Sequence, residues 1–263
     1  MGIEQSNVGS LGELIDLVTP QQPDVVTGRR RDSSVYHGSA DTARLLLTSL
    51  DRLGGATPPH TKIGLEEHVL RNFARYSRPH LAHATDEWEL LVSAQHHGVP
   101  TRLLDWSYSP LVAAHFATVG DQRADRAIWR LDWKQVHRRF GFPELALLID
   151  DLHRLLGRDG AYTPWKLIDE GTHAKAFACM IEPPTLDARI SAQAATFTLC
   201  SDTTRSFDQF LTDHGLETAL TKFVIPEKSK SFIRDQLDLV GVDERRLFPD
   251  LDGVAAQMRR YYS

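Results

Sequence analysis

The chain has 263 residues with a formal charge of −5, and 41% of its residues are hydrophobic and 25% charged. These fractions are typical of folded domains and exclude a wholly disordered chain. No apolar run approaches the ~18 residues of a membrane helix, no secretory signal is visible, and the acidic balance argues against a protein that coats nucleic acid. Two cysteines cannot build a disulfide framework, so we expect a cytoplasmic protein without membrane contact.

The N-terminal half is expected to be mainly helical. Residues 1–30 form a polar N-terminal segment in which residues 11–17 are a short helix or strand, and Val35-Tyr36 is a short strand that enters His37-Gly38-Ser39. Gly38 suits a sharp turn or a close backbone approach. Apolar residues at helical spacing predict helices over residues 42–53, 65–76, 86–96 and 111–118.

Strands dominate the C-terminal half. Alternating or continuous apolar residues predict strands over residues 127–132, 176–181, 193–199 and 220–225, with a strand or bend at 189–191. Helical segments are expected over residues 133–156, interrupted at 141–143, and over 228–240 and 251–262. Because helices come first and strands later, without steady βαβ alternation, the pattern favours an α+β fold over a doubly wound parallel sheet.

Chemistry-bearing side chains concentrate in residues 95–117, which hold histidine, arginine, aspartate, tryptophan, tyrosine and serine around a loop. The loop ends at a helix N-terminus, which suits a phosphate. On composition alone, an interpretation in which these side chains only stabilise the fold has the same weight as one in which they bind a ligand. In the former interpretation Ser109 caps its helix, Asp105 pairs with Arg102, and Trp106 belongs to the core.

Several kinds of site are not expected. No Walker A, GxGxxG, GxSxG or HExxH motif occurs. His96 and His97 are adjacent rather than four residues apart, so no metal site is expected. Cys200 beside Asp202 lacks the surroundings of a reactive thiol.

Residues 95–117 closely resemble the signature of the FRG-domain family, QHxGxPTRLLDWTxSPLxAxxFA. Shorter segments resemble further motifs of that family in the same order, and they are Tyr36-His37-Gly38, residues 48–52, residues 191–198 and residues 247–253. The resemblance runs from about residue 30 to the end. It implies one domain over residues 31–263, because the motifs near residues 37, 107 and 193 must converge on one site. Helical insertions are expected near residues 62–96 and 133–175.

The order of these motifs is similar to that of ADP-ribosyltransferases. Tyr36-His37-Gly38-Ser39 resembles the His-Gly-Ser of poly-ADP-ribose-polymerase-like and diphtheria-toxin-like transferases, in which the histidine binds the adenosine ribose and the glycine backbone holds the nicotinamide amide. The resemblance implies an α+β domain with split, mostly antiparallel sheets and flanking helices. It also implies NAD as the substrate, no metal, and a protein or nucleic acid as the ADP-ribose acceptor.

The resemblance assigns roles to individual residues. His37 would hold a ribose hydroxyl, Gly38 the carboxamide, and Tyr108 or Trp106 would stack on nicotinamide. Arg102 would meet the pyrophosphate and Gln193 the nicotinamide ribose. The catalytic candidates are His37, Tyr108 and Gln193, and the binding candidates are Tyr36, His37, Gly38, Ser39, Arg102, Asp105, Trp106, Ser107 and Ser109.

Glutamine at position 193, in the motif over residues 191–198, leaves other functions open. Gln193 cannot act as a base or offset positive charge, and Asp202 is the closest later acid. One alternative is an NAD glycohydrolase, as a toxin or phage-defence effector that uses water as the acceptor. The other is a non-catalytic module that binds a nucleotide or a partner.

Overall fold

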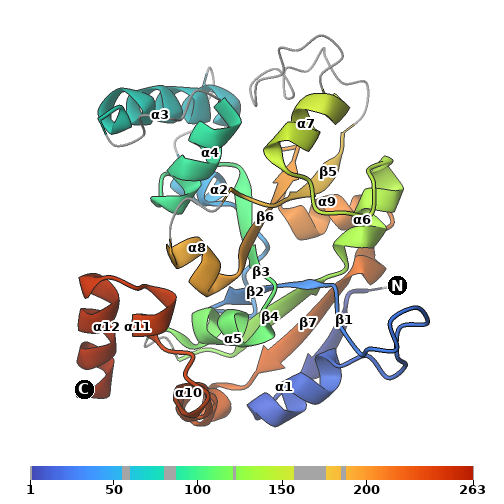
Figure 1. Cartoon of the computed structure of the whole chain (residues 1–263), viewed down its shortest axis with the longest axis vertical. Coiled ribbons are helices and arrows are strands. Elements are labelled where there is room, and N and C mark those ends of the chain that lie inside the picture. Colours follow the sequence, from blue (N-terminus) through green and yellow to red (C-terminus); the bar gives the residue numbers. More distant parts are fainter. Residues whose placement is uncertain are drawn as a thin grey trace.

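The structure is a computed structural model that describes residues 2–54, 60–79, 87–120, 123–156, 176–184 and 188–262. Figure 1 shows helices arranged around a central sheet. Within these ranges the strands are β1 (Glu4–Asn7), β2 (Val35–Ser39), β3 (Leu103–Ser107), β4 (Arg126–Leu131), β5 (Ala178–Ile181), β6 (Ala195–Cys200) and β7 (Leu220–Ile225). The α-helices are α1 (Leu11–Val18), α2 (Ser49–Leu53), α3 (Lys62–Ser77), α4 (Glu87–His96), α5 (Pro110–Thr118), α6 (Trp133–Phe140), α7 (Ile149–Leu156), α8 (Ala188–Gln193), α9 (Phe207–Asp213), α10 (Lys230–Leu239), α11 (Glu244–Leu247) and α12 (Leu251–Tyr261).

The strands form one seven-stranded sheet in the order β1-β7-β4-β2-β3-β6-β5. Neighbouring strands are antiparallel except for β1, which runs parallel to β7. The expected α+β fold with a mostly antiparallel sheet and flanking helices is therefore confirmed. The expectation of separate sheets is corrected, because hydrogen bonding is continuous from one edge to the other.

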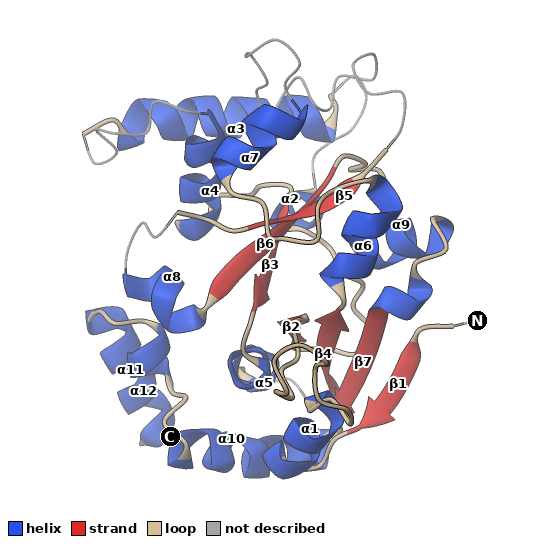
Figure 2. Ribbon diagram, turned by 45° about the vertical axis from the view of Figure 1, so that its right-hand side comes forward, coloured by secondary structure: helices blue, strands red, loops and turns tan. Residues whose placement is uncertain are grey.

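The sheet is nevertheless narrow at its centre. β2 and β4 are paired from Val35 to Ser39, whereas β2 and β3 share one register pair, Tyr36 opposite Ser107. Beyond this pair the two halves of the sheet diverge (Figure 2). We call this place the junction. It separates the half β1-β7-β4-β2 from the half β3-β6-β5.

Different helices cover the two halves on the same side of the sheet. Apolar residues of α1, α5 and α10, among them Leu14, Ala114 and Ile233, pack against β4 and β7. Residues of α3, α4 and α7, among them Leu70 and Leu91, pack against β3, β5 and β6. A third core on the other side spans both halves. The junction thus lies between two groups of helices, as Figure 2 shows.

Gly38 sets how closely α5 approaches β2. A Cβ at this position would lie 2.1 Å from the carbonyl oxygen of Ala113 and 2.6 Å from the backbone nitrogen of Ala117. Real Cβ atoms do not approach backbone atoms so closely, so a larger residue would push α5 away from the sheet. The close backbone approach expected at Gly38 is confirmed.

Two predicted elements differ from the structure. Helix α2 begins at Ser49 rather than near residue 42, because tertiary contacts occupy the preceding backbone: Thr42 N donates to Asp125 O and Leu46 N to Asp208 Oδ1. Residues 189–191 lie in helix α8, not in a strand. Ala194, with φ of 45°, ends that helix, so β6 begins at Ala195 rather than at Gln193.

The expected insertions are helical where the structure describes them, in α3, α4, α6 and α7. Thr85 is a suitable N-cap residue for the helix predicted over residues 86–96. Thr85 and residues 157–175 lie outside the described residues. Among the described segments, no helix is both long and apolar enough to cross a membrane.

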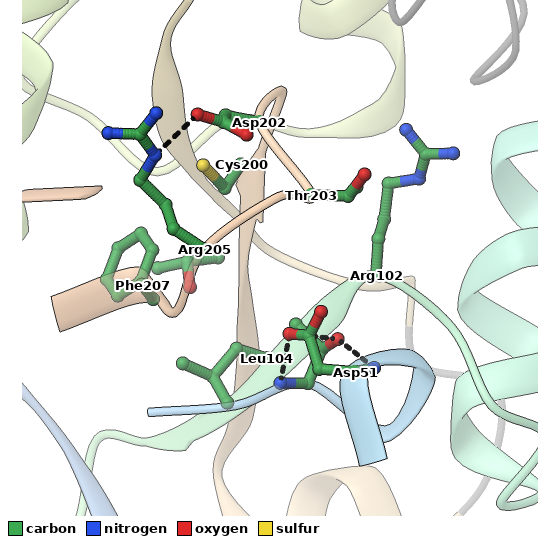
Figure 3. Close-up of a pocket in the computed structure, with 10 residues that line it drawn as sticks. Asp51, Arg102, Leu104, Cys200, Asp202, Thr203, Arg205 and Phe207 are labelled. Atoms are coloured by element: carbon green, nitrogen blue, oxygen red, sulfur yellow. Dashed lines mark hydrogen bonds and ion pairs between the residues drawn. The ribbon is translucent and has the colours of Figure 1, made fainter. Parts of the chain in front are cut away.

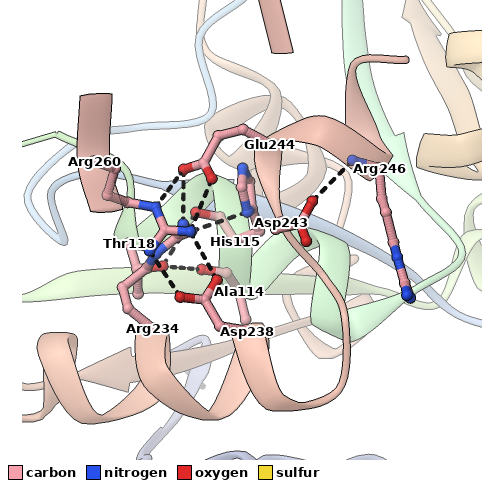
Figure 4. Close-up of polar contacts among 9 residues, drawn as sticks. All are labelled: Ala114, His115, Thr118, Arg234, Asp238, Asp243, Glu244, Arg246 and Arg260. Carbon is pink, nitrogen blue, oxygen red and sulfur yellow. Dashed lines mark hydrogen bonds and ion pairs between the residues drawn. The ribbon is translucent and has the colours of Figure 1, made fainter. Parts of the chain in front are cut away.

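A buried polar cluster ties the C-terminal helices to α5 (Figure 4). Arg234 of α10 donates to His115 Nδ1 (2.9 Å) and to Glu244 Oε1 (2.8 Å). Arg260 of α12 donates to the same Glu244 and, through two nitrogens, to Asp238 (2.7 and 2.8 Å). Burial, followed by the charge of Arg234, lowers the pKa of His115 to about 4, so this histidine is neutral near pH 7. We call these five residues the closed cluster.

Candidate functional site

Three segments that are distant in the sequence meet at the junction. Tyr36 is opposite Ser107 in the sheet register. Ser107 Oγ donates to Gln193 O (2.7 Å), and Tyr108 N donates to Ala194 O (3.0 Å). The strand with His37-Gly38, the segment after β3 and the end of α8 are therefore adjacent.

His37 lies where the pairing between β2 and β3 stops. Its Nδ1 is 2.8 Å from Asp105 O, and its ring meets that of Trp106 edge to face at 5.7 Å between centroids. A carbonyl oxygen can only accept, so Nδ1 carries the hydrogen and Nε2 is left as an acceptor. Burial lowers the pKa of His37, which keeps the ring neutral near pH 7.

Asp105 presents a carboxylate beside His37. Gln95 Nε2 donates to Asp105 Oδ2 (2.8 Å), while Gln95 Oε1 accepts from the hydroxyl of Thr101 and from Ser49 Oγ (3.4 Å). The side chain of Asp105 is exposed to solvent. Neighbouring protein atoms displace part of the water around the carboxyl group, and this desolvation raises the pKa of Asp105. We call His37, Gln95 and Asp105 the open cluster.

Arg102 does not face the junction. Its backbone N–H donates to Glu66 Oε1 (2.7 Å) and its Nε to Glu66 Oε2 (2.5 Å). Arg102 and Glu66 are 2% and 0% exposed. The expected contact with a pyrophosphate does not fit this position, because the guanidinium group is buried against a carboxylate. The alternative pairing with Asp105 is also wrong, since Asp105 bonds with Gln95.

The two aromatic candidates have different surroundings. Trp106 is 3% exposed and its Nε1 donates to Thr198 Oγ1 (2.9 Å), so it belongs to the core. Tyr108 is 38% exposed, and its hydroxyl donates to Glu182 Oε1 (2.8 Å). Burial and the hydrogen bond to Glu182 raise the pKa of Tyr108, so the phenol stays protonated. Of these two residues, Tyr108 is the one accessible for stacking.

Three other candidates make local structural contacts. Ser109 caps α5 by accepting from Val112 N (3.4 Å), as the sequence predicts. Ser39 Oγ donates to Asp41 O (2.9 Å). The hydroxyl of Tyr36 donates to Asp32, and burial raises the pKa of Tyr36.

Gln193 ends helix α8 at the junction. Its backbone carbonyl accepts from Ser107, and its Nε2 donates to Leu247 O (3.0 Å). The side chain is half-buried. Its amide thus joins α8 to α11, while its backbone joins α8 to β3.

Figure 3 shows a small pocket, and none of the residues that line it belongs to the open cluster. It has a volume of about 10 Å³ and is lined by Asp51, Arg102, Cys200 and Asp202, among others. Burial raises the pKa of Cys200 to about 12, so its thiol is unreactive. Asp202 pairs with Arg205 (2.9 Å), so this acid does not replace a carboxylate at Gln193.

Sequence reasoning missed two carboxylates. In the helix predicted over residues 65–76, helical spacing puts Glu66 on the face opposite the apolar residues, whereas in the structure it is buried against Arg102, thirty-six residues away. Glu182 follows β5, which β6 separates from β3, and its Oε1 accepts from the hydroxyl of Tyr108 just after β3. A single sequence carries no local signal for either contact. Where the structure describes side chains, no group of three or more His, Cys, Asp or Glu is arranged to hold a metal ion.

In a comparison with models of protein families, residues 32–126 match the FRG domain. The match begins just before β2 and ends at the start of β4. It therefore includes His37, the open cluster and α5. No curated protein and no solved structure matches the chain.

Proposed function

Since the chain carries an FRG domain over residues 32–126, we propose that it is an NAD-dependent ADP-ribosyltransferase acting on a protein or a nucleic acid. The observation that carries the proposal is the hydrogen bond from Ser107 Oγ to Gln193 O (2.7 Å). This bond joins the motif over residues 95–117 to the motif over residues 191–198. It lies beside the register pair Tyr36–Ser107, and Tyr36 directly precedes His37-Gly38. The NAD substrate would lie along the junction.

The proposed reaction is a substitution at C1′ of the nicotinamide ribose. The C1′–N bond breaks and its electron pair leaves with nicotinamide, which is released neutral. The ribose passes through an oxocarbenium-like state, as in glycoside cleavage. A lone pair of the acceptor then forms the new bond to C1′, and the acceptor's proton goes to water or a basic side chain.

The neutral state of His37 suits this chemistry. Nε2 of its ring can accept a hydrogen bond from a ribose hydroxyl, because Nδ1 is held by Asp105 O. A neutral ring adds no positive charge where the oxocarbenium ion develops, so it does not oppose the transition state electrostatically.

The Asp105 carboxylate suits a sugar diol. It is exposed, and the amide of Gln95 holds it in place at 2.8 Å. Dinucleotide sites commonly use a carboxylate to accept hydrogen bonds from ribose hydroxyls. Tyr108 supplies an accessible ring on which the nicotinamide cation can stack.

Gln193 favours a second function, nucleotide binding without rapid turnover. An amide has no charge to stabilise the oxocarbenium ion, and Nε2 of Gln193 is engaged by Leu247 O. A slow glycohydrolase, with water as the acceptor, is intermediate between the two functions.

The test uses NAD labelled in its adenylate half. Nicotinamide release, label transfer to cell-extract protein and nucleic acid, and NAD binding by calorimetry are measured together. We expect His37→Ala to lower both NAD affinity and nicotinamide release about tenfold or more, because a hydrogen bond to the ribose is lost. His68→Ala is the matched control, since His68 is exposed on α3, away from the junction.

The three readouts separate the candidate functions. Label on a macromolecule supports the transferase. Release of nicotinamide and free ADP-ribose without an acceptor supports the glycohydrolase, and saturable NAD binding without release supports the binding module. Absence of both binding and release would overturn the proposal.

A further inference from the structure

We propose that helix α12 is an interaction surface for a second copy of this chain, with the two α12 helices antiparallel across a two-fold axis. Figure 1 shows α12 at the periphery of the molecule, beside α11. The inference concerns a face of the molecule that the proposed function does not use, so the two can be tested separately.

One face of α12 carries a line of apolar side chains that no described part of the chain covers. Leu251, Met258 and Tyr262 are 85%, 57% and 85% exposed, and Ala255 is also exposed. Spacings of four, three and four residues place these side chains on one face of the helix, as in the seam of a coiled coil. Single exposed apolar residues are common, whereas a continuous line of them is typical of a surface that pairs with another helix. We call these four residues the stripe.

The opposite face of α12 is fixed to the rest of the molecule. Gly253 is buried, and a Cβ there would collide with the carbonyl oxygen of Phe248, so α12 lies directly on the end of α11. Seven residues later, on the same face, Arg260 bonds with Glu244 and Asp238 of the closed cluster (Figure 4). Because the helix is held near both ends, the stripe is a rigid surface that loses little conformational freedom when it pairs.

Charged side chains along one edge of the stripe set the orientation of the second copy. Asp252 directly follows Leu251 and Arg259 directly follows Met258, so the two charges lie on the same edge. Both residues are exposed, and within the described part of the chain neither side chain has a hydrogen bond or an ion pair. A two-fold axis perpendicular to the helix keeps this edge on the same side in both copies and reverses its direction. Asp252 of each copy therefore meets Arg259 of the other.

A parallel arrangement does not give these contacts. It places the Asp252 edge of one copy against the opposite edge of the other, where Val254 and Tyr261 lie. The antiparallel arrangement is thus the one that pairs both charges. An interface of one helix per copy is smaller than that of a permanent dimer, so we expect association in the micromolar range.

Sedimentation equilibrium of the full chain from low to high micromolar concentration measures the association. We expect a monomer–dimer equilibrium that Met258→Asp abolishes, because it buries a charge in the middle of the stripe. Asp252→Arg and Arg259→Asp should each weaken the dimer about tenfold or more, since two ion pairs become two like-charge contacts. Arg71→Asp, the same change of charge at an exposed position on α3, is the matched control and should leave the dimer unchanged.

A mixture of the two charge variants tests the antiparallel arrangement. Each variant repels its own copies, but the Asp252→Arg chain presents two arginines to the two aspartates of the Arg259→Asp chain. The mixture should therefore dimerise about as tightly as the unaltered chain at low salt. Both variants stay negative overall, because the formal charge of −5 changes by two in each. Net attraction between unlike chains cannot explain such a recovery, and the recovery also shows that both variants are folded.

Three results would overturn the inference. They are a chain that stays monomeric across the concentration range, a Met258→Asp variant that still dimerises, and a mixture no more associated than either charge variant alone. A monomeric chain would leave the stripe to a different occupant. Because none of these measurements involves NAD, they give the same answer whether or not the proposed function holds.

Discussion

The open and closed clusters each hold a histidine that burial keeps neutral, yet they differ in how their charges are paired. In the closed cluster Glu244 bonds with both Arg234 and Arg260, and Arg260 also meets Asp238. In the open cluster the carboxylate of Asp105 is held by a neutral amide. Pairing thus distinguishes a cluster that supports the fold from one that retains charge for a ligand.

Solvent access explains the difference. Arg234 and Glu244 are 7% and 8% exposed. A buried charge without a partner costs several kcal/mol, so such groups must pair within the protein. Asp105 is exposed, and water can solvate it until a ligand arrives. The comparison predicts that the closed cluster is sensitive to the loss of one charge and the open cluster is not.

The largest effect is expected for Glu244→Gln. The change leaves the buried Arg234 without a compensating charge, and breaking such a pair lowers the free energy of unfolding by about 3–5 kcal/mol. Asp105→Asn, the matched change in the open cluster, should shift it by less than about 0.5 kcal/mol while weakening NAD binding. Urea denaturation measures both. Equal losses of stability would contradict the distinction between the clusters.

An intermediate effect is expected for Gly38→Ala, which acts on the contact between β2 and α5. These elements carry His37 of the open cluster and His115 of the closed one. The added Cβ would meet Ala113 O at 2.1 Å, and overpacking of this kind costs about 3 kcal/mol. Thermal unfolding measures the loss. Gly12→Ala is the control, because its Cβ would meet no atom closer than 3.8 Å, and it should stabilise α1 slightly.

The smallest effect concerns pH. The pKa of His115 is about 4 in the folded chain, whereas an unfolded histidine titrates near 6.5. Between these values the unfolded chain binds more protons, so stability is complete above about pH 6.5 and falls as the pH drops toward 4. Removing the group with His115→Asn should reduce this slope by at most about 1.4 kcal/mol per pH unit. An unchanged slope in urea denaturation from pH 7.5 to 4.5 would contradict a neutral His115.

Elements with clear periodicity were predictable from the sequence. The strands near 127–132 and 220–225 and the helices near 111–118 and 228–240 are present within a few residues of their expected bounds. Their apolar spacing is decided locally. The start of α2 was not predictable, because Asp208 and Asp125 hold the preceding residues through contacts with distant parts of the chain.

The sequence indicated which segments meet at the candidate site better than it indicated which side chains contact each other there. Motif order indicated that His37, Ser107 and Gln193 would meet, and their segments are adjacent. The partner of Arg102 was not predictable, because helical spacing alone placed Glu66 on a polar face. A sequence position gives the charge of a side chain, whereas the partner that neutralises it depends on how distant helices pack.

The parallel pairing of β1 with β7 has a consequence for synthesis on the ribosome. Glu4 pairs with Thr221, and β7 also lies beside β4 over its whole length. The N-terminal strand therefore leaves the ribosome long before its partner exists, and β4 keeps an open edge in the meantime. Contacts between such distant segments form late, and unpaired strand edges are prone to aggregation. Among the strands that the structure describes, β7 is thus the last to be made, and it closes this half of the sheet.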